Sequence, residues 1–451
     1  MLLSRDLAAG LCVAAAAVLA ISAQSPPSSS LVLMNVNVVP MTGEQVLPEQ
    51  TLIVQDGRIA SMAPAANVRV PQGARRIDAT GRYLIPALAE MHAHIPGGQA
   101  SDAELERVLF LYVANGIGTI RGMLGHPRHL AVRERARNGT LLSPWIYTSG
   151  PSLNGNTVPS RVAAVRAVHD QKAAGYDFLK IHPGILRAPF DALAATARQV
   201  RMPFAGHVPA DVGLQRALEV RYATIDHLDG YVEALAGPQA PASQMFGVNL
   251  VDRIDESRMP ALVAATKASG VAQVPTQALL EHWVGLDDPA DMARWPEMQF
   301  VDRTDLANWV KNKSEMTAKV SAADRSRFLA VRRRLIKMMQ EGGVQLLLGS
   351  DAPQVWNVPG FSIHRELEYL VKAGLTPYQA LESGTRRIAE FFGTSSERGT
   401  IEVGKRADLV LLEANPLQDI RHSARIALVI VGPHVLTREE IDKRLETLKR
   451  P

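Results

Sequence analysis

The sequence predicts an α/β protein: a (β/α)8 barrel of the TIM type, with a small composite β-sandwich domain built from the N-terminal and C-terminal segments. Three observations support this prediction. A chain of 451 residues has room for one large barrel and a smaller domain. Its middle alternates between short apolar runs typical of strands and longer segments typical of helices. Its two ends are rich in short β runs separated by turn residues.

The composition is that of a globular protein with a large core. Hydrophobic residues make up 47% of the chain and charged residues 21%. The formal net charge is only +4, and no block of basic residues is present. Nucleic acid is therefore not an expected partner.

The N-terminus has the pattern of an export signal. Arg5 precedes an apolar stretch over 7–21, and the small residues Ser22 and Ala23 follow. We expect residues 1–23 to be a cleavable signal peptide and the mature protein to be periplasmic or secreted, without membrane contact. The alternative is a single N-terminal membrane anchor, because the apolar stretch is not far short of spanning length.

Cys12 is the only cysteine and lies inside the expected signal peptide. Cleavage would leave a mature chain without cysteine. Disulfides and thiolate metal ligands are then excluded, and histidine, aspartate, glutamate and lysine remain as ligands.

The two ends of the chain predict one small domain. Residues 24–30 have the composition of a linker. Short β runs follow over 31–84, with a turn at Asp56-Gly57, and recur over 399–434. We expect these two segments to form the β-sandwich domain and residues 435–451 to form a C-terminal helix.

The barrel is expected over 85–398. Helical segments separate the β runs; 101–114 opens with a capping box, and 376–392 opens with a threonine cap and a proline. The segment of about 279–325 is too long for a simple connection, so we expect a lid-like insertion there. The eight β runs read YLIPALAEMHAH, GIGTIRG, WIYTSG, YDFLKIH, MPFAGH, YATIDH, VAQVPT and VQLLLGSD.

Residues with metal-ligand chemistry stand at the ends of these β runs. The two histidines of MHAH are two positions apart, so on a strand they point to the same face. In a (β/α)8 barrel the C-terminal ends of the strands converge on one mouth, where the active site lies. Taken singly, each residue could have a structural role instead of binding metal: a histidine could be buried in the core with its hydrogen bonds made, and the lysine could be exposed. The strand-end residues are His92, His94, Lys180, His207, His227 and Asp351.

An ordered set of motifs resembles the amidohydrolase superfamily, in its imidazolonepropionase-like and prolidase-like branch. The matching motifs are IPALAEMHAHIP, DFLKI, AGH, ATIDH, GSDAP, TPYQALESGTRRIAEFFG and GTIEVGKRADLVLLEANPL. The resemblance runs from about Leu31 to about Gly432, nearly the whole expected mature chain. It implies a metal-dependent hydrolase barrel beside a composite β-sandwich.

The resemblance also implies a binuclear metal centre. His92, His94 and Asp351 would hold the more buried ion. His207 and His227 would hold the second. Lys180 would carry a carbamate derived from carbon dioxide and bridge two divalent ions, expected to be zinc. One departure is Glu90, where the family commonly has aspartate; this exchange is conservative.

The chemistry of Lys180 agrees with this assignment. Two nearby cations in a mouth of low dielectric push a lysine towards its neutral amine, which can add carbon dioxide. The metal ions lower the pKa of a shared water and polarise the substrate carbonyl. Asp351 is the expected catalytic residue, which orients the water and carries its proton to the leaving amine.

Several loop residues are candidates for substrate binding. His182 lies two positions beyond Lys180, and Arg121 follows the second β run, where it could pair with a substrate carboxylate. Tyr231 and His282 follow the sixth and seventh runs. Each has a purely structural alternative.

The predicted function is hydrolysis of an amide C–N bond in a small molecule. The expected substrates are dipeptide-like, N-acyl amino acid or aromatic-acyl amino acid compounds resembling ochratoxin. One alternative is a cyclic amidase of the imidazolonepropionase type. Another is a catalytically silent barrel that acts as a binding protein, which would require a missing ligand. The resemblance also implies a homo-oligomer.

Overall fold

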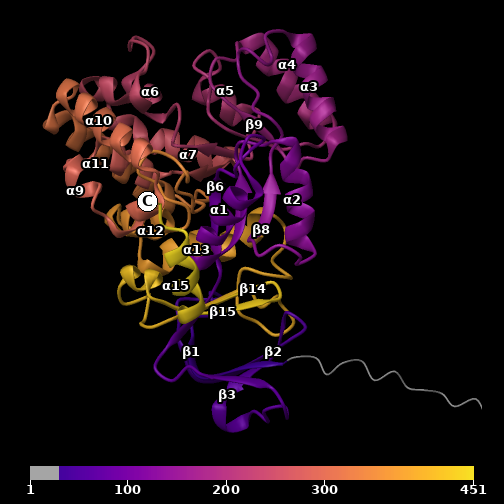
Figure 1. The fold of residues 1–451 in the computed structure, drawn as a ribbon. Helices are drawn as coiled ribbons and strands as arrows, with labels where there is room; N and C mark the ends of the chain where they lie inside the picture. The colour runs from indigo at the N-terminus through magenta and orange to yellow at the C-terminus, as the bar shows by residue number, and fades with distance from the viewer. Residues whose placement is uncertain (1–29, 451) are drawn as a thin grey trace, which may run out of the picture.

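The computed structural model describes residues 30–450. A β-sheet built from both ends of the chain lies at one end of the molecule, and parallel strands surrounded by helices form the rest (Figure 1). The expected signal peptide, 1–23, and residues 24–29 of the expected linker lie outside the described residues. Among residues 30–450, none of the helices combines the length and the apolar character that a bilayer crossing requires.

The N-terminal and C-terminal strands share one eight-stranded sheet. Its order is β15-β14-β13-β5-β1-β2-β3, and β4 pairs with β1. The two ends of the chain meet where β5 and β13 pair antiparallel, with Val410 opposite Ile85. The strands are β1 Leu31–Val38, β2 Leu47–Gln55, β3 Arg58–Pro64, β4 Arg75–Asp78, β5 Tyr83–Pro86, β13 Leu409–Leu412, β14 Ile426–Val431 and β15 His434–Thr437.

Local sequence explains the hairpin between β2 and β3. Asp56 and Gly57 have φ of 51° and 71°, the left-handed backbone that a two-residue hairpin turn requires. The predicted turn is therefore present. Alternating apolar residues such as Leu33, Leu52 and Ile59 are fully buried in the core of this sheet.

Seven strands in the middle of the chain form two parallel sheets, which confirms the predicted mixed α/β class. The orders are β6-β7-β8 and β9-β10-β11-β12. The strands are β6 Leu88–Ala93, β7 Ile117–Gly122, β8 Trp145–Thr148, β9 Leu179–Ile181, β10 Phe204–Gly206, β11 Thr224–Asp226 and β12 Ala272–Val274.

Isolated contacts, rather than continuous ladders, connect the two sheets. Ser149 bridges Phe178 beside β8 and β9. On the other side, Leu346 bridges Gln273 of β12, and Ala352 bridges Ala93 of β6. The eighth predicted β run, VQLLLGSD, is not a strand among the described residues. Its backbone still bonds to β12 and β6, through Leu347 N–H to the Gln273 carbonyl and Met91 N–H to the Leu348 carbonyl. At its end, the backbone N–H of Ser350 donates to the Glu90 carboxylate.

The helices follow the strands in alternation. The α-helices of the first part are α1 Asp102–Ala114, α2 Pro127–Arg137, α3 Arg161–Ala174, α4 Arg187–Gln199, α5 Gly213–Glu219, α6 Tyr231–Ala236, α7 Met259–Ser269 and α8 Gln277–Val284. Those of the second part are α9 Pro289–Met292, α10 Arg303–Lys319, α11 Ala322–Glu341, α12 Phe361–Lys372, α13 Pro377–Ser383, α14 Arg386–Phe391 and α15 Arg438–Thr447. Short 3-10 helices are η1 Ala65–Asn67, η2 Met245–Arg253, η3 Glu256–Arg258, η4 Pro296–Phe300 and η5 Ile420–Ala424.

Two helix predictions can be compared directly with these bounds. Ser101 caps α1 by accepting a hydrogen bond from the backbone N–H of Glu104, as predicted. The helix expected over 376–392 is instead broken between α13 and α14 at Gly384. The break occurs because the Gly384 carbonyl accepts a hydrogen bond from Ala89 N–H at 2.9 Å, which ties this turn to β6.

The segment predicted as an insertion, about 279–325, contains the end of α8, α9, η4, α10 and the start of α11. It contributes a satellite core, in which Trp309 packs 5.8 Å from the fully buried Trp356. The final helix begins at Arg438 rather than at 435, because residues 435–437 still pair within the sheet as part of β15.

Candidate metal centre

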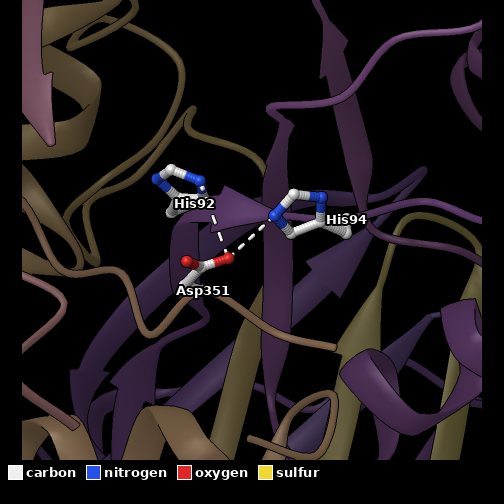
Figure 2. A group of neighbouring side chains, drawn as sticks. All are labelled: His92, His94 and Asp351. Atoms are coloured by element: carbon white, nitrogen blue, oxygen red, sulfur yellow. Dashed lines mark hydrogen bonds and ion pairs between the residues drawn. The ribbon is translucent and has the colours of Figure 1, made fainter. Parts of the chain in front are cut away.

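The predicted ligands on β6 meet Asp351 at one point. His92 is on β6, His94 directly follows that strand, and Asp351 is the last residue of the eighth predicted β run; Figure 2 shows the three side chains together. His94 Nε2 lies 2.7 Å from Asp351 Oδ1, and His92 Nε2 lies 3.7 Å from the same oxygen. One ligand atom from each residue lies within 4.8 Å of the others, so together they could hold one metal ion.

Lys180 lies beside this group, in the middle of β9. Its Nζ is 3.5 Å from His92 Nε2, and the side chain is fully buried. Burial lowers the pKa of Lys180, and the nearby carboxylates of Asp226 and Asp351 offset this only in part. The site therefore favours the neutral amine more than water does.

Three further histidines extend the cluster in a row of rings. The ring of His227 lies 4.6 Å from that of His92 and 4.7 Å from that of His207. His182 stacks on the other side of His207 at 5.1 Å. The structure thus gathers His182, whose position the sequence left open, with the predicted ligands.

Hydrogen bonds hold the rings of the outer histidines at Nδ1. His207 Nδ1 lies 2.7 Å from Asp229 Oδ2, and His227 Nδ1 lies 2.8 Å from Thr276 Oγ1. With Nδ1 occupied, Nε2 is the ring nitrogen left to bind a metal ion, the usual role of such partners in metal sites. His182 is held in the same way, with Nδ1 2.5 Å from Ser152 Oγ.

Arg121 and Asp226 form a buried support beneath His92. Arg121 donates to the Met91 carbonyl at 2.7 Å, to Thr224 Oγ1 at 3.0 Å and to both oxygens of Asp226. Asp226 Oδ2 in turn lies 2.9 Å from His92 Nδ1. The guanidinium is fully buried, and this arrangement favours a structural role for Arg121 over the predicted contact with a substrate carboxylate.

Glu90 supports the backbone between the ligands. Its Oε1 accepts hydrogen bonds from the N–H groups of His92 at 2.9 Å and Ser350 at 2.8 Å. Burial raises the pKa of Glu90 to about 8, although these hydrogen bonds oppose the shift. The substitution of glutamate for the family's aspartate therefore leaves a residue that links β6 to the loop that carries Asp351.

The electrostatics favour neutral imidazoles at His92 and His227 and an ionised Asp351. Burial, together with Lys180, lowers the pKa of His92 well below its usual value, and burial does the same for His227. Burial raises the pKa of Asp351, but His92, His94 and Lys180 outweigh it, so this pKa lies well below its ordinary value. Neutral imidazole nitrogen and a carboxylate oxygen are the protonation states that bind a divalent cation.

Two other candidate substrate residues lie in packed surroundings. Tyr231 is fully buried, and its hydroxyl is 2.7 Å from Thr266 Oγ1. His282 is also fully buried, with Nδ1 2.8 Å from Asn357 Oδ1 and its ring against Trp295. These contacts favour structural roles for both side chains.

The donor set fits a divalent metal ion. It offers imidazole nitrogen and carboxylate oxygen without sulfur, a chemistry suited to zinc and related ions. The supporting residues Asp226, Asp229 and Thr276 were missed by the sequence analysis. A signal for Asp226 was present, since it directly precedes the predicted ligand His227 in the motif ATIDH.

Comparisons with known proteins identify the family of the chain. A model of the amidohydrolase family matches residues 83–436, most of the chain. The chain therefore belongs to the amidohydrolase family, and the predicted class, a hydrolase that acts on carbon–nitrogen bonds, is confirmed at this level.

Related sequences are distant but extensive. An adenine deaminase of Rhizobium meliloti is 23% identical over 86% of this chain and 56% of its own length. The ochratoxinase of Aspergillus niger is 22% identical over 85% of this chain and 81% of its own. An imidazolonepropionase of Micrococcus luteus is 23% identical over 82% of this chain and 89% of its own length. The chain thus spans little more than half of the adenine deaminase.

Solved structures support the fold. A bottromycin amidohydrolase superimposes with a TM-score of 0.69 at 22% identity, covering 93% of this chain and 91% of that one. A Xaa-Pro dipeptidase with bound methionine gives 0.65 at 18% identity, covering 91% of this chain and 100% of that one. At these identities the likeness concerns the fold alone.

Proposed function

We propose that the protein is an exported, metal-dependent amidohydrolase that cleaves an amide C–N bond in a small molecule. The observation that carries the proposal is the convergence of His92, His94 and Asp351 beside the buried amine of Lys180. The parallel strands would form a closed barrel whose mouth holds these residues. Export rests on the sequence pattern of residues 1–23.

Two divalent ions, zinc by the donor chemistry, would occupy the centre. His92, His94 and Asp351 would hold one, and His207 and His227 the other. Lys180, as a carbamate formed from carbon dioxide, would provide two oxygens between them. Support comes from its burial and lowered pKa, since the neutral amine is the form that adds carbon dioxide.

The side chains have separate tasks in the proposed reaction. When bound, the ions supply Lewis-acid polarisation of the amide carbonyl and lower the pKa of water. Asp351 accepts the proton of the attacking water and returns it to the leaving amine. His182, held through Nδ1 by Ser152, has Nε2 available for the substrate. Thr276 and Asp229 keep the rings of His227 and His207 in place.

The proposed substrates are dipeptide-like, N-acyl amino acid or aromatic-acyl amino acid amides. A cyclic amide, as the name imidazolonepropionase implies for one relative, is the second candidate. A protein that binds without catalysis is disfavoured, because every predicted ligand is present in the sequence. We also propose a homo-oligomer.

Metal analysis of a lysine variant tests the centre. We expect about two equivalents of metal per wild-type chain. Lys180→Ala should lose at least one of them and the activity, and added bicarbonate should speed reconstitution of the metal-free wild type. Lys172→Ala, on the exposed face of α3, is the matched control and should retain both. Full metal content and activity in Lys180→Ala would contradict the carbamate.

A hydrolysis screen tests the substrate. Amino-acid or amine release is measured from dipeptides, N-acyl amino acids, aromatic-acyl amino acids and cyclic amides. If only the cyclic compounds open, the second candidate replaces the first.

A further inference from the structure

An aromatic pair lies beside the histidine cluster and has no part in the proposed metal chemistry. The Phe246 ring lies 5.6 Å from the ring of His227. On its other side it meets Trp283 edge-on at 6.3 Å. Both aromatic residues are half-buried. Phe246 is the one that contacts a predicted metal ligand, and Trp283 adjoins Phe246.

The backbone at Phe246 is strained, which indicates that its position is built into the fold. Phe246 has φ of 60°, and its neighbour Met245 has φ of 49°, in the left-handed region that bulky residues rarely adopt. Such conformations persist where the surroundings fix them, and they cluster at functional sites. In this backbone conformation the Phe246 ring lies next to that of His227.

Two contacts fix this turn. Gly247 follows Phe246 with φ of 93°, and a Cβ there would come within 2.6 Å of Val232 on α6, so the backbone is pressed against that helix. Figure 1 shows α6 on the side of the molecule remote from the eight-stranded sheet. The side chain of Asn249 accepts from the Gln244 N–H at 2.7 Å and closes the loop.

Basic side chains that could recognise a substrate carboxylate are absent from the described loops at the ends of the parallel strands. The loops that follow the parallel strands and the eighth β run contain no lysine or arginine within the described part of the chain. Arg121, the predicted partner for a carboxylate, has its guanidinium occupied by Asp226, Thr224 and a carbonyl. The loops are 94–101, 123–126, 149–160, 182–186, 207–212, 227–230, 275–276 and 347–360.

We propose that Phe246 and Trp283 determine specificity, by packing against a flat aromatic group on the acyl side of the scissile amide. This inference rests on the proposed function and narrows its substrates to aromatic-acyl amides. A carboxylate on the leaving amine then contributes little. Aromatic rings prefer offset or edge-to-face packing at 4.5–7 Å between centroids, and such contacts add to the gain from burial.

Paired substrates test the proposal with the metal-loaded enzyme. We compare kcat/KM for N-(1-naphthoyl)glycine, N-acetylglycine and N-(1-naphthoyl)glycinamide. Phe246→Ala should lower kcat/KM for the naphthoyl substrate about tenfold more than for the acetyl substrate. The glycine and glycinamide forms should differ by less than about threefold in the wild type, because the loops that follow the parallel strands contain no lysine or arginine to pair with the carboxylate.

Controls separate this proposal from a general loss of structure. Phe392→Ala removes another half-buried aromatic ring, which stacks on Tyr147 at 3.7 Å, and should leave the naphthoyl preference unchanged. Phe246→Leu should lose less than Phe246→Ala. An equal loss for naphthoyl and acetyl substrates in Phe246→Ala overturns the proposal, as does a glycinamide form that is cleaved tenfold more slowly.

A binding measurement distinguishes failure of this proposal from failure of the proposed function. If the metal-loaded wild type cleaves none of these amides, amide hydrolysis is the idea that fails. Calorimetric titration with 1-naphthoic acid and acetic acid then tests the aromatic site by itself. Naphthoic acid should bind Phe246→Ala about tenfold more weakly than wild type; equal binding to the two proteins refutes the role of Phe246.

Discussion

Replacement of Arg121 by methionine should destabilise the protein far more than loss of a surface ion pair. The side chains of Arg121 and Asp226 are 2% and 0% exposed, and their closest atoms are 3.2 Å apart. Removing one partner of a buried pair leaves an uncompensated charge and costs about 3–5 kcal/mol. We therefore expect Arg121→Met to lose about 4 kcal/mol of unfolding free energy.

A matched surface pair provides the comparison. Arg187 and Asp191 are closer, at 2.9 Å, but 46% and 37% exposed. Such pairs contribute about 0–1 kcal/mol, so Arg187→Met should change little. Burial rather than distance decides the difference. Urea denaturation of the metal-free variants at pH 7, followed by circular dichroism, measures both values.

A double variant locates the cause. Arg121→Met combined with Asp226→Asn removes the unpaired charge, so it should be more stable than Arg121→Met alone. If Arg121→Met loses less than about 1 kcal/mol of unfolding free energy, the guanidinium does not support the site.

Two further predictions concern pH and backbone geometry. Burial raises the pKa of Glu366 from 4.5 to about 7, so the folded protein keeps a proton that the unfolded chain releases. The resulting stability is fully present below pH 4.5 and is lost as the pH rises to about 7. Over this range the unfolding free energy of Glu366→Gln should rise by about 3 kcal/mol relative to that of the wild type, as measured by urea titrations. A difference between variant and wild type that stays constant with pH would contradict this prediction. Gly247→Ala should lower the unfolding free energy by about 1–3 kcal/mol more than Gly404→Ala, as measured by thermal or urea unfolding. The two glycines have nearly the same φ, but only at Gly247 would the added Cβ meet a neighbour, Val232. Equal losses would show that Val232 gives way.

Much of the candidate site followed from local sequence. The spacing of His92 and His94 on one strand predicted their shared face, and the structure brings both to Asp351. Lys180 stood out as a charge in an apolar run, and it is fully buried beside His92. Position at the end of a strand was enough to predict that these residues lie together, because parallel strands carry their C-terminal residues to one edge of the sheet.

Other features depend on contacts that no local pattern encodes. Arg121 and Asp226 are 105 positions apart, so the sequence could not show that the guanidinium is already occupied. The break between α13 and α14 arises from a hydrogen bond between Gly384 and Ala89, and helix propensity alone favours continuation. The hydrogen bond from Ser350 N–H to Glu90, 260 positions apart in the sequence, likewise follows from no local pattern.

Because β5 pairs with β13, the N-terminal part of the sheet is completed only when the C-terminal strands have been synthesised. Arg82 and Glu413, 331 positions apart, form an ion pair next to this pairing. The N-terminal strands are therefore synthesised long before the strand that completes their sheet. Until β13 arrives, β5 presents an unpaired edge, a template for pairing with other chains. The C-terminal strands thus protect the nascent protein against aggregation, and nonsense truncation before residue 409 would leave that edge open.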